Sequence, residues 1–564
     1  MARLYQSGKM NKEAGVVYDY LMTRDTPQQD ARVGAIDVAL AEGKTDRARH
    51  LAAGLRSNDA PDRLLLQARV AEAQGNHQQA MSYLRSARGK LLGLQGAGGS
   101  GAPTLGGLAL ADNPFAATAS RAQPASPSVY GQAMPWQVAQ LGRNPQTAPP
   151  GAIRSDIPVE SAQAGTLRQV DNMIEQLTEK TATWARGSVS ARGRDGESGL
   201  SKLTEVKAPL QWSTVPFGDS RFDINVTPVS LNAGSASQQS STRFGTGALI
   251  QGEVAQDIYN ASTTTPPTRP DLDTLTVPSQ GSQKASGVEV GMALTGDQYK
   301  IDVGSTPLGQ DLNTVVGGVQ WSPQLTDYLK LILTGERRAV MDSLLSYVGV
   351  EDKYSGKRWG QVTKNGGSAQ LSYDNGDAGF YAGFGLYNYL GENVPSNNNV
   401  TGTAGVYIRP FYAEDRELKT GISMTYMDFS KNLSYFSYGQ GGYFSPQDYV
   451  SVSFPVDYSQ TFDNWKMSVG ASLGYQSYTQ DKSAYFPGDK RLQSQLEDYV
   501  ANGFAKEAYY SGNSENGLGY NLRAAADYKI NKDMTIGGQV GYDTFGDYNE
   551  STAQLYFRYL LGNN

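Results

Sequence analysis

The residues that most often carry enzymatic chemistry are scarce in this sequence. None of the 564 residues is cysteine, so the chain has no thiolate nucleophile, disulfide or Cys-ligated metal. Only two histidines occur, His50 and His77, and both are expected to be solvated residues of N-terminal helices. Nothing after His77 can supply a Ser-His pair or an imidazole ligand. We therefore expect no catalytic residue, no metal site and no cofactor.

Tyrosines at alternate positions of extended segments offer a different chemistry. A tyrosine ring has a flat apolar face and a hydroxyl at its edge, so it can stack on a pyranose ring and hydrogen-bond its hydroxyls. Weak contacts of this kind, repeated along a wall, suit a polymer that must slide, because tight binding would stall it. The candidate sugar-contact residues are Tyr381, Tyr387, Tyr389, Tyr407, Tyr556, Gln476, Arg523 and Asp527. The alternative is that these tyrosines pack or form interfacial aromatic girdles.

Aromatic residues also gather in the long connections between the extended segments. A connection that folds inward could gate a pore, whereas the alternative is ordinary packing of surface loops. The candidate gating residues are Tyr438, Tyr443, Phe444, Tyr485, Phe486, Tyr509 and Tyr510.

From about Trp184 to the end of the chain, apolar and polar residues alternate with a period of two. Clear runs are Phe380–Tyr389, Met467–Gln476 and Leu555–Leu561. The first two runs have ten residues each, which is long enough for a tilted strand to cross a bilayer. The glycine and tyrosine counts, 64 and 34, fit a barrel wall better than a helical core.

The connections between these segments alternate between short and long. Tight turns are expected at 374–377, 413–417, 463–464 and 531–533, and long loops at 256–285, 341–360, 430–447 and 479–517. Short periplasmic turns and long extracellular loops are typical of outer-membrane barrels. A soluble β-sandwich would share the alternation but would not need the asymmetry. We predict that residues 184–564 form an outer-membrane β-barrel.

Seventeen segments qualify as strands, and bacterial barrels normally have an even number, so about 16 antiparallel strands are predicted. The first segment, Trp184–Arg194, is interpreted as the supernumerary one because Arg186, Arg192 and Arg194 share one face. About sixteen strands leave a water-filled channel. Its predicted lining mixes charges of both signs, whereas an ion-selective porin would show a ring of one sign.

Before the barrel, residues 1–94 repeat. Ala14, Ala48 and Ala80 are 34 and 32 residues apart, and Gly8, Gly43 and Gly75 precede them, which is the tetratricopeptide period. The fold class is therefore α-helical tetratricopeptide repeats followed by an all-β transmembrane barrel. The chain starts within a repeat, so we expect further repeats and a signal peptide upstream.

Residues 95–164, rich in glycine and proline, are predicted to be a flexible linker. Residues 165–183 are predicted to form a short amphipathic helix with Leu167, Val170, Ile174 and Leu177 on one face. We expect this helix to plug or dock at the periplasmic mouth of the barrel, and a simple spacer is the alternative.

Four stretches resemble the outer-membrane component of bacterial cellulose synthase, the family of cellulose synthase operon protein C: Gly199–Leu210, Arg337–Tyr347, Trp359–Gly367 and Gly439–Tyr449. The resemblance extends over essentially the whole chain, and family members carry more repeats than the three present here. It implies export of cellulose, a neutral β-1,4-glucan, through the outer membrane. It also implies that the repeats, in the periplasm, reach toward periplasmic and inner-membrane synthase subunits.

Other functions remain open at this stage. An exporter of an amino-sugar or uronate polymer would be expected to have a strongly charged lumen. A general porin or a scaffold anchored by the barrel are further alternatives. An outer-membrane lipase or protease would need histidine in the barrel, whereas a glycoside hydrolase would need only a carboxylate pair, which the sequence cannot single out. The net charge of −6 argues against a nucleic-acid partner, and the expected surroundings are outer-membrane lipid.

Overall fold

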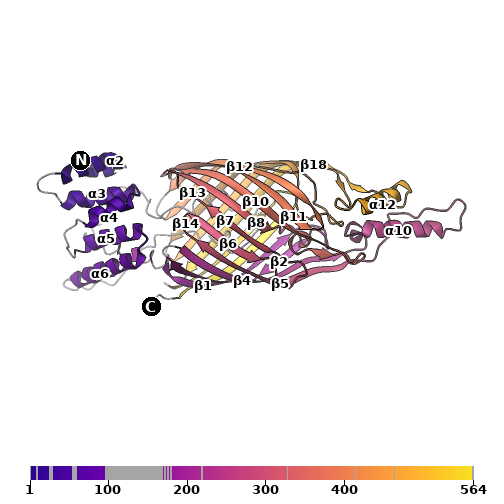
Figure 1. Cartoon of the computed structure of the whole chain (residues 1–564), viewed down its shortest axis with the longest axis horizontal. Coiled ribbons are helices and arrows are strands. Elements are labelled where there is room, and N and C mark those ends of the chain that lie inside the picture. Colours follow the sequence, from indigo (N-terminus) through magenta and orange to yellow (C-terminus); the bar gives the residue numbers. More distant parts are fainter. Residues whose placement is uncertain are drawn as a thin grey trace.

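The computed structural model describes residues 2–7, 10–23, 29–53, 60–95, 169–170, 173–174, 177, 181–217, 220–296, 298–326, 328–412, 415–462, 464–531 and 533–561. Helices come first, and one large antiparallel sheet follows (Figure 1). The predicted linker lies outside the described residues apart from Gln95, so it stays a prediction. Within the described part of the chain, no helix is long and apolar enough to cross a membrane.

The N-terminal helices form antiparallel pairs. They are α1 (Ala2–Ser7), α2 (Asn11–Met22), α3 (Gln29–Ala41), α4 (Thr45–Ala53), α5 (Pro61–Ala73) and α6 (His77–Gln95). Ala14, Ala48 and Ala80 are fully buried, because only a small side chain lets two helices approach closely. Gly43 and Gly75 have φ values of 68° and 72° in the turns between helices, a conformation that favours glycine. These features confirm the predicted helical repeats.

His77 differs from its expected position. His50 is exposed, but His77, the first residue of α6, has only 8% of its surface exposed. The prediction that both histidines are solvated is therefore wrong for His77. A position at a helix start does not by itself reveal burial.

The helix predicted at the barrel mouth packs on the last repeat. Its described residues Val170, Met173 and Leu177 are buried in one apolar cluster with Leu84 and Leu91 of α6. A terminal repeat has an apolar face that must be covered, and this segment covers it. The apolar stripe thus caps the last repeat, and plugging or docking at the barrel mouth stays a prediction. The predicted contribution of Leu167 lies outside the described residues.

The barrel contains sixteen strands, as predicted. They are β1 (Thr183–Arg194), β2 and β3 (Leu203–Lys207 and Leu210–Phe217, one crossing), β4 (Ser220–Ala236), β5 (Gly281–Thr295), β6 (Tyr299–Ser305), β7 (Val315–Trp321), β8 (Leu329–Ala339), β10 (Arg358–Asp374), β11 (Ala378–Glu392), β12 (Val394–Tyr412), β13 (Arg416–Phe429), β14 (Gln447–Phe462), β15 (Trp465–Gln480), β18 (Asn513–Lys529), β19 (Met534–Asp543) and β20 (Glu550–Leu561).

One barrel strand is interrupted at a proline. Both β2 and β3 pair with β1, and Ala208 and Pro209 lie between them. Proline has no N–H to donate to a ladder, so regular pairing stops there. The Pro209 carbonyl still accepts a hydrogen bond of 3.0 Å from the Ser188 amide, which keeps the wall continuous.

The barrel is closed by the strand that the sequence pattern excluded. β1 pairs with β20 over twelve residues, from Thr183 opposite Leu561 to Arg194 opposite Glu550. The prediction that Trp184–Arg194 is supernumerary is therefore wrong. Its arginines made it look unsuited to lipid, but they face the interior, where Arg192 contacts Glu205 at 3.3 Å.

Short turns join the strands at one end of the barrel, and long connections join them at the other. The long connections span residues 237–280, 340–357, 430–446 and 481–512. They contain η3 (Ser240–Arg243), α10 (Gly247–Asn260), α11 (Leu344–Val348), β9 (Val350–Glu351), β16 (Ser483–Ala484), α12 (Lys490–Ala501) and β17 (Tyr509–Tyr510). In Figure 1, α10 and α12 project beyond the end opposite the C-terminus. The long-loop end is thus the extracellular one.

Closure by β1 can be tested by cross-linking. Val189 and Leu555 are directly paired across β1 and β20, and both point outward with 56% and 72% of their surfaces exposed. Opposed residues have Cβ atoms about 4.5–5.5 Å apart, close to disulfide range. We expect Val189→Cys with Leu555→Cys to cross-link on oxidation, shown by a mobility shift on a denaturing gel that reductant reverses.

The matched control uses Leu518 on β18, an outward residue of a strand that does not pair with β1. Val189→Cys with Leu518→Cys should stay uncross-linked. Equal cross-linking of both pairs, or none with Leu555, would contradict the closure.

Candidate functional site

The eight residues predicted to contact sugar all lie on the inner face of the barrel. Tyr407 is only 2% exposed, whereas its neighbours Val406 and Ile408 point outward with 55% and 53% exposed. The same alternation places the others inward: Tyr381, Tyr387, Tyr389, Tyr556, Gln476, Arg523 and Asp527. Inward orientation follows from the period of two, and contact with sugar stays a prediction.

Cations of the wall cover two of these tyrosine rings. The Lys364 Nζ atom lies 3.7 Å from the ring centroid of Tyr387, and the Arg186 Cζ atom lies 4.2 Å from that of Tyr556. Each contact is a cation–π interaction between buried groups, worth about 2 kcal/mol. One face of each ring is therefore occupied in this structure.

The hydroxyls of two others anchor them to neighbouring strands. The Tyr381 hydroxyl donates to Ser423 at 2.7 Å, and the Tyr407 hydroxyl donates to Asp374 at 3.0 Å. Arg409 donates to both carboxylate oxygens of Asp374, at 2.7 and 2.6 Å. These rings are fixed parts of a polar wall.

Of the three remaining polar candidates, Gln476 and Arg523 are also engaged with described residues, whereas Asp527 is not. Gln476 accepts hydrogen bonds from Tyr449 at 3.2 Å and from the Gly546 amide at 2.7 Å. Arg523 contacts Asp457 at 2.5 Å. Asp527 is 5% exposed, and within the part of the chain that the structure describes its carboxylate accepts no hydrogen bond.

Charges on the inner wall are arranged in opposed pairs. Among the described strands these pairs include Arg409–Asp374, Arg523–Asp457, Lys364–Glu336, Arg192–Glu205 and Lys207–Glu289, at 2.5 to 3.3 Å. Their fields largely cancel, so the wall presents polarity without a dominant sign.

A buried loop occupies the extracellular mouth. From 432 to 446 every residue is buried except the half-buried Tyr435. A buried loop must pair its backbone groups, and this one does so with other loops. The Phe436 carbonyl accepts from the Gly245 amide at 3.0 Å, and the Gly442 carbonyl accepts from the Ser343 hydroxyl at 2.6 Å. We call the packed connections 237–280, 340–357, 430–446 and 481–512 the loop plug.

One aromatic cluster joins all four connections of the plug. Tyr438 lies 5.6 Å from Trp359 between ring centroids, and Trp359 lies 5.3 Å from Phe244. Tyr485 and Tyr510 stack at 4.1 Å. The cluster also contains Leu345, Phe436, Phe486, Leu492 and Leu496.

A second cluster ties the plug to the barrel wall. The rings of Tyr443 and Tyr389 stack with their centroids 5.1 Å apart. Phe444 packs edge-on against Tyr478 at 5.1 Å, beside Tyr449. Burial raises the pKa values of the Tyr443, Tyr485 and Tyr510 hydroxyls, so these phenols are neutral when packed.

Tyr509 does not share this arrangement. It is 36% exposed, its hydroxyl donates to Glu497 at 2.6 Å, and its ring lies 4.1 Å from Lys482 Nζ. Of the seven predicted gating residues, six lie in the buried clusters and Tyr509 lies on the surface. A role in gating is untested for all seven.

Sequence reasoning missed the short helix α11, all five of whose residues are buried. It begins with a capping box in which Ser343 and Ser346 each accept from the other's backbone. Tyr347 of α11 contacts Glu289 on β5 through its hydroxyl, and Lys207 on β2 donates to that hydroxyl at 3.0 Å. The helix is thereby fastened to the inner wall.

Two arginines of β1 hold the same segment. Arg192 donates to the Met341 carbonyl at 2.9 Å, and Arg194 donates to the Asp342 carbonyl at 2.6 Å. Both guanidinium groups also contact Glu550. We call Arg192, Arg194, Glu205, Lys207, Glu289, Glu550 and Tyr347 the wall latch. In the sequence, the wall latch is visible only as the set of arginines in 184–194. Taken alone, these arginines argue against a membrane strand, so they did not indicate the latch.

These features define a class of protein. A closed barrel with an apolar outer face, a polar inner face, short turns at one end and packed loops at the other is an outer-membrane barrel of the channel type. The fold points to a role in transport, and the protein lies in the outer membrane.

Comparison with known proteins identifies the family. The chain belongs to the family described as the C-terminus of cellulose synthase operon protein C, which matches residues 201–562. "Cellulose synthase operon protein C" of Pseudomonas fluorescens (strain SBW25) is 32% identical over the whole chain and 42% of its own length. A protein of the same name from Komagataeibacter xylinus is 29% identical with the same coverage. The chain thus spans less than half the length of these relatives.

Among solved structures, one described as a bacterial polysaccharide outer membrane secretin aligns with 68% of this chain and 99% of its own. The TM-score is 0.40 and the sequence identity 10%. Likeness at this level carries no argument about function.

The wall latch yields a test. Tyr347→Phe removes the hydroxyl that satisfies Lys207 and Glu289, at a cost of about 1–3 kcal/mol. We expect the 340–357 connection to open more often, so native-state trypsin cleavage within it, for example at the exposed Lys353, should accelerate about 5- to 100-fold. Tyr328→Phe changes an exposed tyrosine near the opposite end and should leave the rate unchanged. A wild-type rate for Tyr347→Phe would contradict the fastening role.

Proposed function

We propose that this protein is the outer-membrane channel through which cellulose, a β-1,4-glucan, passes from the periplasm to the cell surface. The observation that carries the proposal is the inner wall, where aromatic rings and charge pairs line a closed sixteen-strand barrel. The family supports it, because its relatives are named for a cellulose synthase operon.

The pairing of charges suits a neutral polymer. A ring of acids would hold a polycation, and a ring of bases would hold a uronate chain. In pairs such as Arg523–Asp457, whose side chains are 26% and 21% exposed, the charges balance, and the exposed polar atoms offer hydrogen bonds to sugar hydroxyls without attracting counter-ions. A glucan would therefore meet many shallow binding sites and would move by facilitated diffusion.

The wall tyrosines are proposed to be part of the track. Lys364 covers one face of Tyr387, and a pyranose ring would compete with this cation–π contact, which is worth about 2 kcal/mol between buried groups. Tyr556 with Arg186 has the same arrangement. If a pyranose ring and the cation exchange places on the tyrosine ring, the ring face has a contact whether or not a polymer is present.

The loop plug is proposed to be the gate. Its aromatic clusters bury rings from connections that lie far apart in sequence, so they must part for a polymer to leave. Force would come from the growing polymer, since the sequence has no phosphate-binding loop.

The channel is proposed to have no catalytic activity. Cysteine is absent, and both histidines lie in the helical repeats. The repeats are proposed to bind periplasmic or inner-membrane subunits of the synthase, since stacked helical repeats present concave protein-binding surfaces.

Planar bilayer recording tests the function. We expect a variant in which a short Gly-Ser linker replaces residues 434–444 to conduct ions. Cello-oligosaccharides should then block its current reversibly, whereas uronate and amino-sugar oligomers should block it far less. Free conduction without a glucan-specific block would contradict the assignment of cellulose as the substrate, but it would not contradict the barrel fold.

A tyrosine pair tests the track. In the loop-shortened channel, Tyr387→Ala removes an inward ring and should shorten glucan block about 2- to 10-fold, the effect of losing about 0.5–1.5 kcal/mol of aromatic contact. Tyr475→Ala removes an outward ring that is 52% exposed and should have no effect. Equal block times in both variants would contradict a role for the inner tyrosines.

A further inference from the structure

A row of polar side chains runs around the outer face of the barrel near its extracellular end. Arg337 on β8 donates to Asn365 on β10 at 2.7 Å. Asn365 donates to the Asn388 carbonyl on β11 at 3.1 Å, and Asn388 donates to Asn398 on β12 at 2.7 Å. These four residues are paired in register across the strands. We call them the outer polar row.

The depth of this row matches the upper boundary of the membrane. Trp321 and Tyr328, more than half exposed, mark the periplasmic interface near the start of β8. Arg337 lies eight residues above Leu329, or about 26 Å along a strand and roughly 20 Å along the membrane normal at a tilt of about 40°. The apolar band of such barrels is about 25 Å tall, so the Arg337 backbone lies about 5 Å below its upper edge, and the long side chain carries the guanidinium up to the lipid headgroups.

A groove lies beside the row on the outer face of β6, β7 and β8. It has a volume of about 720 Å³ and is lined by Ile301, Val303 and Val319, which are 46–53% exposed, together with Arg337. Across the strands, Gly317 pairs with Arg337, and Gly335 pairs with Val319. A Cβ atom added at Gly335 would meet open space, so the groove is hollow at that position.

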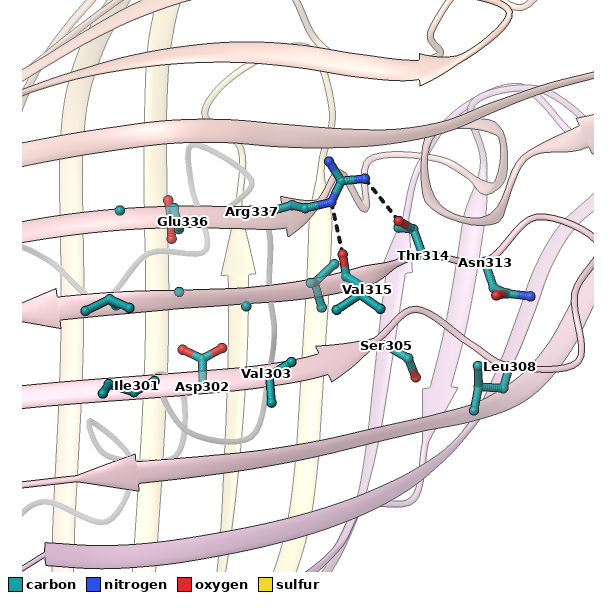
Figure 2. A pocket seen from close by; sticks show the side chains of 15 residues that line it. Ile301, Asp302, Val303, Ser305, Leu308, Asn313, Thr314, Val315, Glu336 and Arg337 are labelled. Carbon is teal, nitrogen blue, oxygen red and sulfur yellow. Dashed lines mark hydrogen bonds between the residues drawn. The ribbon is translucent and has the colours of Figure 1, made fainter.

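Arg337 is held over this groove by neutral acceptors. Its guanidinium donates to the Val315 carbonyl and the Thr314 hydroxyl at 3.0 Å each (Figure 2). It also donates to Asn365. A guanidinium has five N–H groups, so two remain, and among the described residues no carboxylate forms an ion pair with Arg337. By contrast, the nearby Arg358 contacts Asp311 at 2.9 Å and Glu351 at 3.1 Å.

We propose that this groove and Arg337 form a binding site for a phosphate-bearing lipid of the outer leaflet. The phosphate would contact Arg337 and the outer polar row, and an acyl chain would lie in the groove over Gly335. An exposed guanidinium that lacks a carboxylate partner suits a phosphate, which accepts charge-assisted hydrogen bonds. The apolar lining suits an acyl chain. The lipid site depends on the outer-membrane location and not on cellulose export. The lipid proposal and the export proposal can therefore be wrong independently of each other.

The test uses the full chain in phosphatidylcholine nanodiscs with and without lipid A. Native mass spectrometry after detergent release measures the fraction of protein that retains lipid A. We expect Arg337→Gln to reduce this fraction about tenfold by removing the phosphate contact. Gly335→Val should also reduce it, because the side chain fills open groove space at a strand position that favours β-branched residues.

Arg358→Gln is the matched control, because that guanidinium already binds two carboxylates, and it should retain lipid A at the wild-type level. Dephosphorylated lipid A should be retained about tenfold less by the wild type. Added inorganic phosphate should not displace lipid A, since the acyl chain contributes to binding. Equal retention by the wild type and both groove variants, or equal retention of both lipids, would overturn the proposal.

Discussion

Within a bilayer every backbone N–H and C=O must find a partner inside the protein, and the rest of this structure depends on how that requirement is met. Pairing of β1 with β20 satisfies the last two edges and closes the sheet at sixteen strands. A sheet closed at that size encloses more space than wall side chains fill. Inward residues therefore face a polar interior, and the extracellular loops have a wide mouth to occupy.

The loops occupy that mouth through contacts between distant parts of the chain. Tyr347 meets Lys207 and Glu289, which lie 140 and 58 residues away in sequence. Buried charges stabilise such an arrangement only when each has its partners, so the wall latch acts as a unit and losing one member affects the others. The plug is consequently a defined packed state, and opening it means separating loops from each other or from the wall.

The sequence predicted what depends on local periodicity. Alternation with a period of two placed the eight wall residues inward, and the tetratricopeptide spacing placed Ala14, Ala48 and Ala80 between helices. It failed where distant partners decide: the first strand was excluded for arginines whose carboxylates lie far along the chain. The stretches 337–347 and 439–449 carried the family resemblance, yet no local pattern showed that 340–347 and 439–446 fold inward as part of the plug.

The most direct test of the account is to lock the plug in a cell that makes the glucan. A Cβ atom at Gly442 would lie 2.8 Å from the Ser343 Oγ atom, so Ser343→Cys with Gly442→Cys places two thiols of different loops within disulfide reach. The account predicts that cellulose at the cell surface, measured by dye binding, disappears when this bond forms and returns when external reductant breaks it, while Ser343→Cys alone exports normally with and without oxidant. Undiminished export with the cross-link shown to be complete on a non-reducing gel would contradict the account.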